Sequence, residues 1–385
     1  MFSLGQPGPT LLCPGVANPG KRMQVTVQTP CLTGAALAGL EAEWRALERQ
    51  ASASFFQSWS WIGCRVAERF VRPVLIRAVA EGRTVGLALF NRCPLPLARH
   101  ALWLHQTGHT AEDSVFIEHN GPLVADGYGA AAPAILQAAL RHGGVVVLSG
   151  IGQTLYEAAC GLGRTTRLTR RAAPHAVLAN QNAAAWQAAR GTATRAQLRR
   201  SQRRLETLGP LRAERAATAP EALGFLAELA RLHQAAWSGR GQPGAFAEPA
   251  FWRFHTELVT SGVPRGEVAL WRISAGGQGV GYLYNFEWQG SVLSYQSGFD
   301  LAAVPRASPG LVAHAAAIGA AAGAGFGRYD FLAGDARFKR ELSDAAIPLY
   351  WLELASVWQP RSLFHGAAAG LRQRLRKADH HKIPT

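Results

Sequence analysis

Two segments of the chain repeat the same order of expected elements nearly 200 residues apart. Residues 74–92 and residues 268–300 alternate apolar and polar side chains, which predicts half-buried strands joined by short turns. An aromatic-rich segment precedes each copy, at 55–70 and at 249–258, and is expected to form a helix. A period of this length indicates a duplicated domain rather than a solenoid of short repeats. We therefore expect an α/β protein with two similar units, each a mixed, mostly antiparallel sheet flanked by helices.

Further elements are expected around this repeat. A helix at about 130–141 and a buried strand at 144–151 belong to the first unit, and a bridging strand near 175–179 leads into helices around 183–208. The 385 residues are enough for two ordinary domains, each with its own core. We divide the chain into a flexible leader, an N-terminal unit, a basic helical connector, a C-terminal unit, and a basic C-terminal helix with its tail: residues 1–24, 25–180, 181–209, 210–355 and 356–385.

The composition argues against several classes of protein. Hydrophobic residues make up 48% of the chain and charged residues 17%, which is typical of a globular protein and not of a disordered one. The five cysteines are widely spaced and form no C-x-x-C pair, which argues against a disulfide scaffold and a zinc site. The N-terminus lacks the apolar run of a signal peptide, and no apolar stretch of about 18 residues suits a membrane helix. We expect a cytoplasmic protein without a bound metal, and Met23 is an alternative start.

The net charge of +15 is concentrated in two places. Residues 190–215 hold eight Arg and two Glu, and residues 361–385 hold six basic residues and one Asp. A coat for nucleic acid along the whole chain is therefore not indicated. The basic run 194–206 predicts either a solvated helix face or a contact with acidic saccharide, phospholipid or RNA phosphate. Residues 363–377 predict a helix that either docks on the second unit or makes a peripheral contact with an anionic membrane.

A Ser-Pro-Gly turn opens an Ala-rich segment that is expected to be helical. Ser308 suits the N-cap, Pro309 suits the first helical position, and Gly310 allows close approach of the backbone to a ligand. The free N–H groups and the positive dipole end of such a helix form an anion site. The candidates for holding an anionic group there are Arg306, Ser308, Pro309, Gly310 and Leu311.

An expected short strand at 327–332 leads into a polar turn. Asp330 lies in the strand, where a buried carboxylate must be paired, so we expect it to cap a turn or to hold a neighbouring side chain. Asp335 follows at the exit of the strand, where a carboxylate can reach a cleft. Lys339 could stabilise a developing oxyanion or a phosphate with its ammonium group. The alternative is that Asp335 is an N-cap and Lys339 a solvated charge.

A third group of candidates precedes the second copy of the strands. His233 and Trp237 are four residues apart and share one helix face, and Arg240 follows in a Gly-rich loop. His233 is either a general base near neutral pH or a partly buried, hydrogen-bonded side chain, and Arg240 suits an anion clamp. In the first unit, Asp113, Glu118 and His119 belong to a loop that either faces a cleft between the units or, as is more common for such loops, is simply solvated.

Together these motifs resemble the GNAT acyltransferases, and in particular the CelD/Fem-like double-GNAT branch. The Ser-Pro-Gly turn is similar to the strand–turn–helix with which GNAT enzymes hold the pyrophosphate of coenzyme A. The Y-D-F, G-D and F-K motifs within 329–339 are similar to a hallmark of the branch, and H-x-x-x-W-x-x-R-G at 233–241 is similar to its acceptor-side segment. The resemblance covers most of residues 25–355 and implies that the C-terminal unit, 210–355, is catalytic.

The resemblance also implies a reaction and roles. An acetyl or other short acyl group would move from acetyl-CoA or another acyl-CoA to an amine or hydroxyl, in a pathway such as polysaccharide or envelope biosynthesis. Asp335, or else His233, would orient or deprotonate the acceptor, and Lys339 with backbone N–H groups would stabilise the oxyanion. Phe338 and Lys339 would contact the acyl group. The side chains expected on the substrate side are Trp237, Arg240, Tyr284, Asp330 and Phe338.

Two alternatives stay open from the sequence. The first is a Fem-type transferase with an aminoacyl-tRNA donor, which is not favoured because the chain lacks the long coiled-coil insertion of those relatives. The second is a non-catalytic GNAT-fold scaffold in polysaccharide or envelope assembly. For acyl transfer we expect a small-molecule, saccharide or lipid-linked acceptor. The binding of acyl-CoA separates this preferred function from both alternatives.

Overall fold

The computed structural model describes residues 23–95 and 99–356. Their strands form one sheet in the order β1-β2-β3-β4-β6-β13-β7-β12-β11-β10-β9-β8, with β5 paired to β3. The strands are β1 (Met23–Gln28), β2 (Pro73–Ala80), β3 (Arg83–Leu95), β4 (Arg99–Leu104), β5 (Leu123–Val124), β6 (Gly144–Gly152), β7 (Arg164–Val177), β8 (Leu211–Arg215), β9 (Val268–Ala275), β10 (Gln278–Trp288), β11 (Ser291–Phe299), β12 (Arg328–Asp330) and β13 (Ala345–Ala355). The α-helices are α1 (Gly34–Glu48), α2 (Trp59–Ile62), α3 (Val66–Arg69), α4 (Ala131–Gly143), α5 (Gln153–Leu162), α6 (Ala183–Ala188), α7 (Thr192–Leu205), α8 (Ala219–Ser238), α9 (Pro249–Gly262), α10 (Pro309–Gly323) and α11 (Arg337–Leu342).

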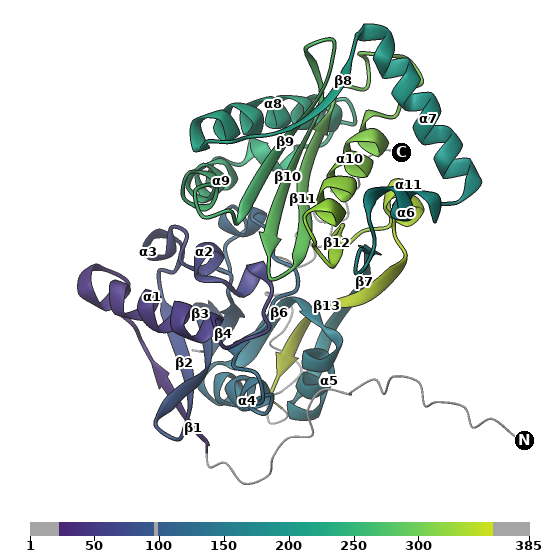
Figure 1. Ribbon diagram of the computed structural model, residues 1–385. Coiled ribbons are helices and arrows are strands. Elements are labelled where there is room, and N and C mark those ends of the chain that lie inside the picture. The colour runs from purple at the N-terminus through teal and green to yellow at the C-terminus, as the bar shows by residue number, and fades with distance from the viewer. Residues whose placement is uncertain (1–22, 96–98, 357–385) are drawn as a thin grey trace, which may run out of the picture.

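The elements form two units, as the repeat predicts (Figure 1). In the first unit, α4 packs on the sheet of β1, β2, β3, β4 and β6; in the second, α8 and α9 cover one face of β9, β10 and β11, and α10 covers the other (Figure 1). Among the named strands, only β4 with β6 and β11 with β12 pair in parallel. The expected α/β class, with mostly antiparallel sheets flanked by helices, is confirmed.

The repeated strand pairs also form where the pattern predicts them. Each hairpin turns on two residues with positive φ: Glu81–Gly82, Gly276–Gly277 and Gln289–Gly290. Two-residue turns of this kind match the right-handed twist of the strands that they join. Both units therefore have a hairpin at the corresponding place.

The aromatic segment 55–70 differs from the single helix that we expected. It forms a 3₁₀ turn at Phe55–Gln57 followed by the short helices α2 and α3. The interruption lies at Arg65, whose φ of 52° is left-handed and cannot continue an α-helix. The expected helix of the second copy does form, as α9.

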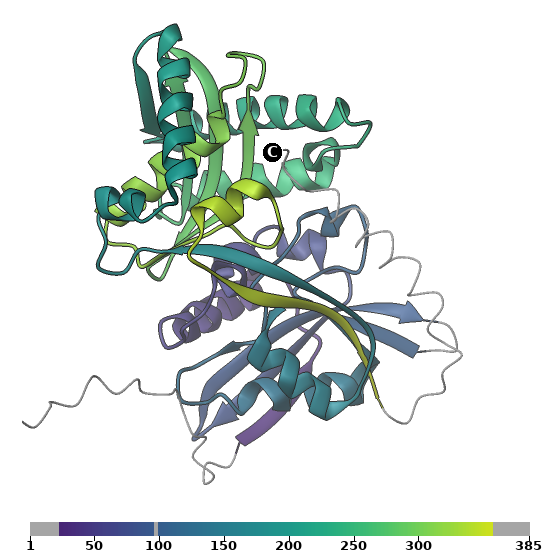
Figure 2. The ribbon, with the colours of Figure 1, turned by 90° about the vertical axis from the view of Figure 1, so that its right-hand side faces the viewer.

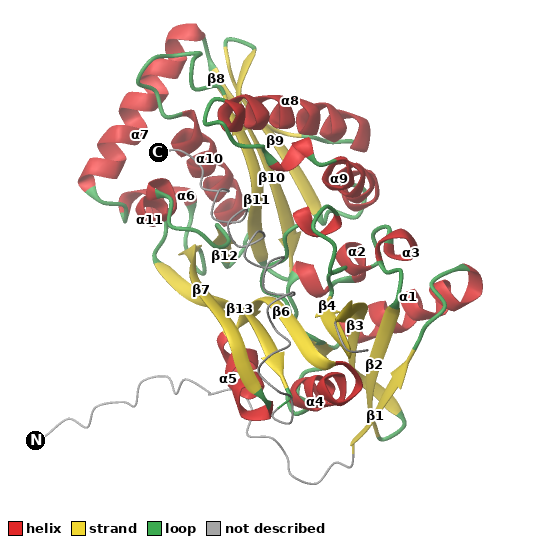
Figure 3. Ribbon diagram, turned by 180° about the vertical axis from the view of Figure 1, so that it is seen from behind, coloured by secondary structure: helices red, strands yellow, loops and turns green. Residues whose placement is uncertain are grey.

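A long antiparallel ribbon of β7 and β13 joins the two units. At one end β13 pairs with β6 of the first unit, and at the other end β7 pairs with β12 of the second. Figure 2 shows this ribbon crossing from one unit to the other, and Figure 3 shows it from behind. The sequence predicted only the end of β7, near 175–179. Because of the ribbon, residues far apart in the chain share one sheet.

Aromatic side chains fill the junction between the units. Phe55 stacks on Phe286 with ring centroids 4.3 Å apart, and Trp61 lies 4.9 Å from Phe254 and 5.6 Å from Tyr295. All five side chains are buried. Aromatic pairs of this kind add about 0.5–1.5 kcal/mol each beyond their buried area. The junction is therefore a packed core, and it fixes the walls of the cavity described below.

Within 23–95 and 99–356, no helix is both long enough and apolar enough to span a membrane. The same residues contain no group of three His, Cys, Asp or Glu side chains able to hold a metal ion. Residues 1–22 of the expected leader and residues 357–385 of the expected C-terminal helix lie outside the described residues.

Candidate functional site

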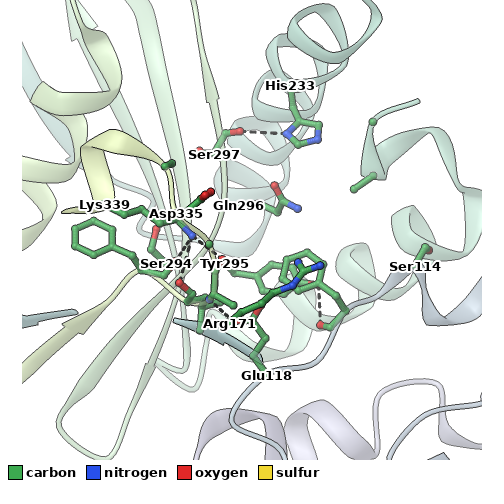
Figure 4. Close-up of a pocket in the computed structure, with 18 of the residues that line it drawn as sticks. Ser114, Glu118, Arg171, His233, Ser294, Tyr295, Gln296, Ser297, Asp335 and Lys339 are labelled. Atoms are coloured by element: carbon green, nitrogen blue, oxygen red, sulfur yellow. Dashed lines mark hydrogen bonds between the residues drawn. The ribbon is translucent and has the colours of Figure 1, made fainter. Parts of the chain in front are cut away.

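A cavity of about 420 Å³ lies where the two units meet. Its walls come from the 110–118 loop of the first unit, from β7 and β13, and from α8, β11 and α11 of the second. Figure 4 shows the labelled side chains, with His233 at one end and Glu118 at the other. The residues that line the cavity include Glu118, Arg170, Arg171, His233, Ser294, Tyr295, Gln296, Ser297, His314, Leu332, Ala333, Asp335, Phe338, Lys339 and Trp351.

The outer edge of β11 opens into this cavity. Strand β11 pairs with β12 only over Ser291–Leu293, and residues 294–297 then line the cavity. The pairing of β11 with β10 has a β-bulge within this stretch, because Tyr284 pairs with Gln296 and the next residue, Asn285, pairs with Ser294. Beyond Leu293, no described strand pairs with this edge of β11. An unpaired strand edge presents backbone N–H and C=O groups to an extended ligand.

Lys339 organises the turn at 331–335 between β12 and α11. Its Nζ donates hydrogen bonds to the carbonyl oxygens of Phe331 at 2.7 Å, Leu332 at 3.3 Å and Ala333 at 2.9 Å. An ammonium group has three N–H donors, so these carbonyls use all of them. Burial lowers the pKa of Lys339, and three nearby carboxylates oppose that shift. These three hydrogen bonds indicate that Lys339 maintains the conformation of the 331–335 turn.

Asp330 fixes the same turn from the other side. Its Oδ1 accepts the N–H of Leu332 at 2.8 Å, and its Oδ2 lies 2.5 Å from Arg328 and 3.2 Å from Nε2 of His119. Burial alone would raise the pKa of Asp330, but His119, Arg328 and the N–H hold it below its usual range. Leu332 has a φ of 60°, a strained conformation that persists only where the surroundings enforce it. The expectation that Asp330 holds a neighbour is confirmed, and its side chain does not line the cavity.

Glu118 reaches the turn from the first unit. Its Oε2 accepts the N–H of Ala333 at 2.6 Å, and the residue is 7% exposed. Burial raises the pKa of Glu118, although the Ala333 N–H, Lys339 and His119 oppose the shift. The sequence placed Glu118 in a loop that can face a cleft, and it does line the cavity. No local pattern singles it out, because its partner is 215 positions away.

His233 lies on α8 at the opposite end of the cavity. Its Nδ1 is 3.3 Å from the carbonyl oxygen of Ser297, which makes Nδ1 the protonated nitrogen. The ring packs against Trp237 and Phe246, with centroids 5.7 Å and 5.4 Å away. Gly298 allows this contact, since a Cβ there would lie 2.4 Å from the carbonyl oxygen of Leu229 on α8.

Phe338 and His314 form an apolar wall of the cavity. Their rings stack 4.9 Å apart at an interplanar angle of 13°. Nδ1 of His314 lies 3.1 Å from the hydroxyl of Tyr329, and burial, with a smaller effect of Lys339, lowers the pKa of His314 to about 3. The imidazole is therefore neutral, and this wall suits an uncharged group.

Basic and aromatic side chains of the ribbon form another wall. Arg170 and Arg171 of β7 line the cavity together with Trp351 of β13. The guanidinium of Arg171 lies 5.5 Å from the ring centroid of Trp351. A cation over an indole face is a stable arrangement. These residues were not predicted from the sequence, because the arginine-rich segment of β7 lacks the apolar–polar alternation that is typical of a half-buried strand.

Three other expected substrate-side residues do not line the cavity. Trp237 is buried beneath His233, and Arg240 lies 5.5 Å from its ring. Tyr284 is a core residue whose hydroxyl is 3.0 Å from Nδ1 of His255. Burial raises the pKa of Tyr284 well above its usual value. Of the expected catalytic and substrate-side residues, the structure brings together His233, Asp335, Phe338 and Lys339 around the cavity.

The Ser-Pro-Gly turn lies at the N-terminus of α10, outside the cavity lining. Pro309 is the first helical residue as predicted, and Ser308 takes the N-cap position but makes no side-chain capping bond. Instead its Oγ accepts a hydrogen bond from Gln197, because α7 packs across the helix end. Gly310 is small for a different reason than we expected: a Cβ there would lie 2.9 Å from the ring of Phe299. Arg306 is exposed and its carbonyl accepts a bond from Arg204, while Leu311 is buried.

Comparison with known families identifies one matching domain. The model of the acetyltransferase (GNAT) domain matches residues 192–340, which include α7, α8 and α10 as well as most of the cavity residues of the second unit. No curated protein matches the sequence.

Several solved structures have a similar fold. The C-terminal domain of a putative lysylphosphatidylglycerol synthetase from Agrobacterium fabrum is 14% identical, with a TM-score of 0.53, and covers 90% of this chain and 99% of its own. FemX is 11% identical, with a TM-score of 0.57, and covers 81% and 96%. L-PGS from Bacillus licheniformis is 13% identical, with a TM-score of 0.53, and covers 89% and 97%. At these identities the likeness concerns the fold, which extends over both units.

Proposed function

We propose that this protein moves an acetyl or other short acyl group from a CoA thioester to an amine or hydroxyl, because residues 192–340 match the acetyltransferase (GNAT) domain and the fold of both units is similar to that of FemX. The observation that carries this proposal is the open edge of β11 beyond Leu293, beside a cavity that contacts both faces of the sheet. His233 belongs to the α8 face and His314 to the α10 face. A donor and an acceptor can therefore approach the same point from opposite sides.

The open edge suits the extended, amide-containing arm of an acyl-CoA. Such an arm can add to β11 like a further strand, with its amides bonded to the backbone of residues 294–297. The neutral wall of Phe338 and His314 would then enclose the acyl group. Lys339 would act by holding the 331–335 turn, and the exposed Asp335 would contact the acceptor.

The N-terminus of α10 is the proposed pyrophosphate site. The N–H groups of Gly310 and Leu311 lie in the first helical turn, where an α-helix provides no internal acceptor. The helix dipole and the exposed Arg306 add positive charge, as does Arg204 of α7. The pyrophosphate site that the resemblance implies is therefore proposed at the N-terminus of α10, with α7 packed beside it.

A second candidate is aminoacyl transfer, and the likeness to FemX and L-PGS favours it. The exposed arginines 199, 200 and 203 of α7 are compatible with contact to an RNA phosphate. We rank acyl-CoA first for two reasons. The matched domain is an acetyltransferase domain. In addition, the longest helix among the described residues, α8, has 20 residues, so the described part of the chain contains no long coiled-coil insertion like that of the tRNA-dependent relatives. From the resemblance we also propose a saccharide or lipid-linked acceptor, and from the free cysteines a cytoplasmic location.

Titration calorimetry with acetyl-CoA tests the proposed donor. We expect a micromolar Kd and at least a tenfold weaker Kd, about 1.4 kcal/mol, for Arg306→Glu, which reverses charge at the α10 terminus. The matched control is Arg83→Glu, an exposed charge reversal on the first unit. Gly310→Asp is unsuitable because the new side chain would collide with Phe299.

Two results would contradict the proposal. No binding at millimolar acetyl-CoA would remove acyl-CoA as the donor and favour the aminoacyl alternative. Equal affinity of the two charge-reversal variants would move the pyrophosphate site away from α10.

A further inference from the structure

Glu118 is a buried carboxylate that the first unit contributes to the cavity. One oxygen, Oε2, is held by the N–H of Ala333 at 2.6 Å. The other oxygen, Oε1, has no hydrogen-bond donor among the described residues, although the residue lines the cavity wall (Figure 4). A carboxylate with one oxygen fixed and one oxygen available has the geometry of a general base.

Four charged or titratable groups surround Glu118. Lys339 belongs to α11, Asp330 to β12, Tyr295 to β11 and His119 to the same loop as Glu118. Lys339 gives its N–H groups to backbone carbonyls, and His119 lies beside Asp330. Glu118 is therefore near positive charge without being neutralised in an ion pair, and burial moves its pKa upward, toward the range of a base that works near neutral pH.

We propose, on the basis of the acyl transfer proposed above, that Glu118 is the general base of the reaction. Its Oε1 takes the proton of the acceptor N–H or O–H while the lone pair of that atom forms a bond to the thioester carbonyl carbon. The carbon–sulfur bond then breaks, and the electron pair leaves with the sulfur. The proton passes from Glu118 to the thiolate or to solvent, which restores the carboxylate. Atoms and charge balance without any further reactant.

The other two candidates fit this role less well. Asp335 is exposed to solvent, whereas Glu118 is buried in the wall of the cavity. His233 lies at the other end of the cavity, beyond the β11 residues 294–297 (Figure 4). Glu118 contacts the 331–335 turn itself. It follows that the matched domain, residues 192–340, does not contain the base and that the first unit completes the catalytic site.

Glu118→Gln tests the assignment with little structural disturbance, because the amide oxygen can still accept the N–H of Ala333. Glu353→Gln is the matched control: Glu353 is also buried, burial also raises its pKa, and it does not line the cavity. Thiol release from acetyl-CoA is followed with water and with glucosamine as acceptor probes, between pH 5 and pH 9, on full-length protein. The Kd for acetyl-CoA and the Tm are measured for each variant.

We expect E118Q to lower kcat at least about 100-fold, with an unchanged Kd for acetyl-CoA, and E353Q to keep wild-type kcat. Wild-type kcat/KM should fall at acidic pH as the base is protonated, and E118Q should lack this fall. A kcat of E118Q within twofold of wild type would overturn the role of Glu118 and leave the acyl transfer standing. If the wild type binds acetyl-CoA but releases no thiol with either probe, the assignment of a catalytic base fails. If it binds none, the proposed function itself fails.

Discussion

At the scale of single residues, the 331–335 turn is held by Lys339 from within the second unit and by Glu118 from the first unit. Lys339 is the only lysine between Lys21 and Lys377, and it lies on the cavity wall. Its role follows from three carbonyl contacts that no sequence pattern encodes. The role of Glu118 could not be predicted from a local pattern either, because its hydrogen-bond partner, Ala333, is 215 positions away in the chain.

Lys339→Met should therefore reduce stability as well as activity. The substitution removes three charge-assisted hydrogen bonds and leaves three carbonyl oxygens without a donor, which should cost about 2 kcal/mol or more. Urea unfolding measures the free energy, and Arg337→Met on the exposed face of α11 is the control, expected within about 0.5 kcal/mol of wild type. Unchanged stability with a large loss of kcat would instead support a direct role in the transition state.

At the scale of helices and strands, the sequence predicted what local periodicity determines. The hairpins of β2 with β3 and of β9 with β10, and the helices α4, α9 and α10, form where expected. The ribbon of β7 and β13 was largely missed because its first half is an arginine-rich strand with no clear apolar face. The open edge of β11 could not be predicted either, because it depends on where β12 stops pairing.

The contact between α8 and β11 gives a prediction at this scale. Gly298→Ala should destabilise the protein by about 1–3 kcal/mol, because its Cβ would collide with the backbone carbonyl of Leu229 and push α8 away. Gly224→Ala on the exposed side of the same helix meets nothing within 4 Å and should be neutral or stabilising by up to about 1 kcal/mol. Thermal unfolding of both variants compares them, and equal Tm values would refute the close contact.

At the scale of the whole molecule, the candidate site belongs to both units. The first unit supplies Glu118, the ribbon supplies Arg171 and Trp351, and the second unit supplies the 331–335 turn and β11. Strand β13, which falls in the C-terminal unit 210–355 of the sequence-based division, lies between β6 and β7 in the sheet. Duplication explains why two similar units exist, and the buried junction explains how side chains from both are held at one cavity.

Buried neutral histidines on both sides of the junction should make the stability of the molecule sensitive to acid. Burial is the main cause that lowers the pKa of His105 and of His314 to about 3, and it lowers the pKa of His255 well below the usual value. In the unfolded chain each imidazole binds a proton near pH 6.5. Unfolding below that pH therefore takes up protons, so the stabilisation is complete above about pH 6.5 and is lost progressively toward pH 3.

Each buried histidine is expected to lower the free energy of unfolding by about 1.4 kcal/mol per pH unit, or by about 2 kcal/mol between pH 6.5 and pH 5. Buried carboxylates such as Glu118 and Glu353, whose pKa values are raised, act in the opposite direction, so only a comparison of variants isolates one histidine. His105→Gln should reduce the fall in unfolding free energy between these two pH values by about 2 kcal/mol, whatever its effect on stability at pH 7. His109→Gln is the control, because that side chain is exposed and meets solvent in both states. Urea titrations of the three proteins at both pH values measure the difference, and a pH dependence of H105Q equal to that of wild type would show that His105 is not held neutral by burial.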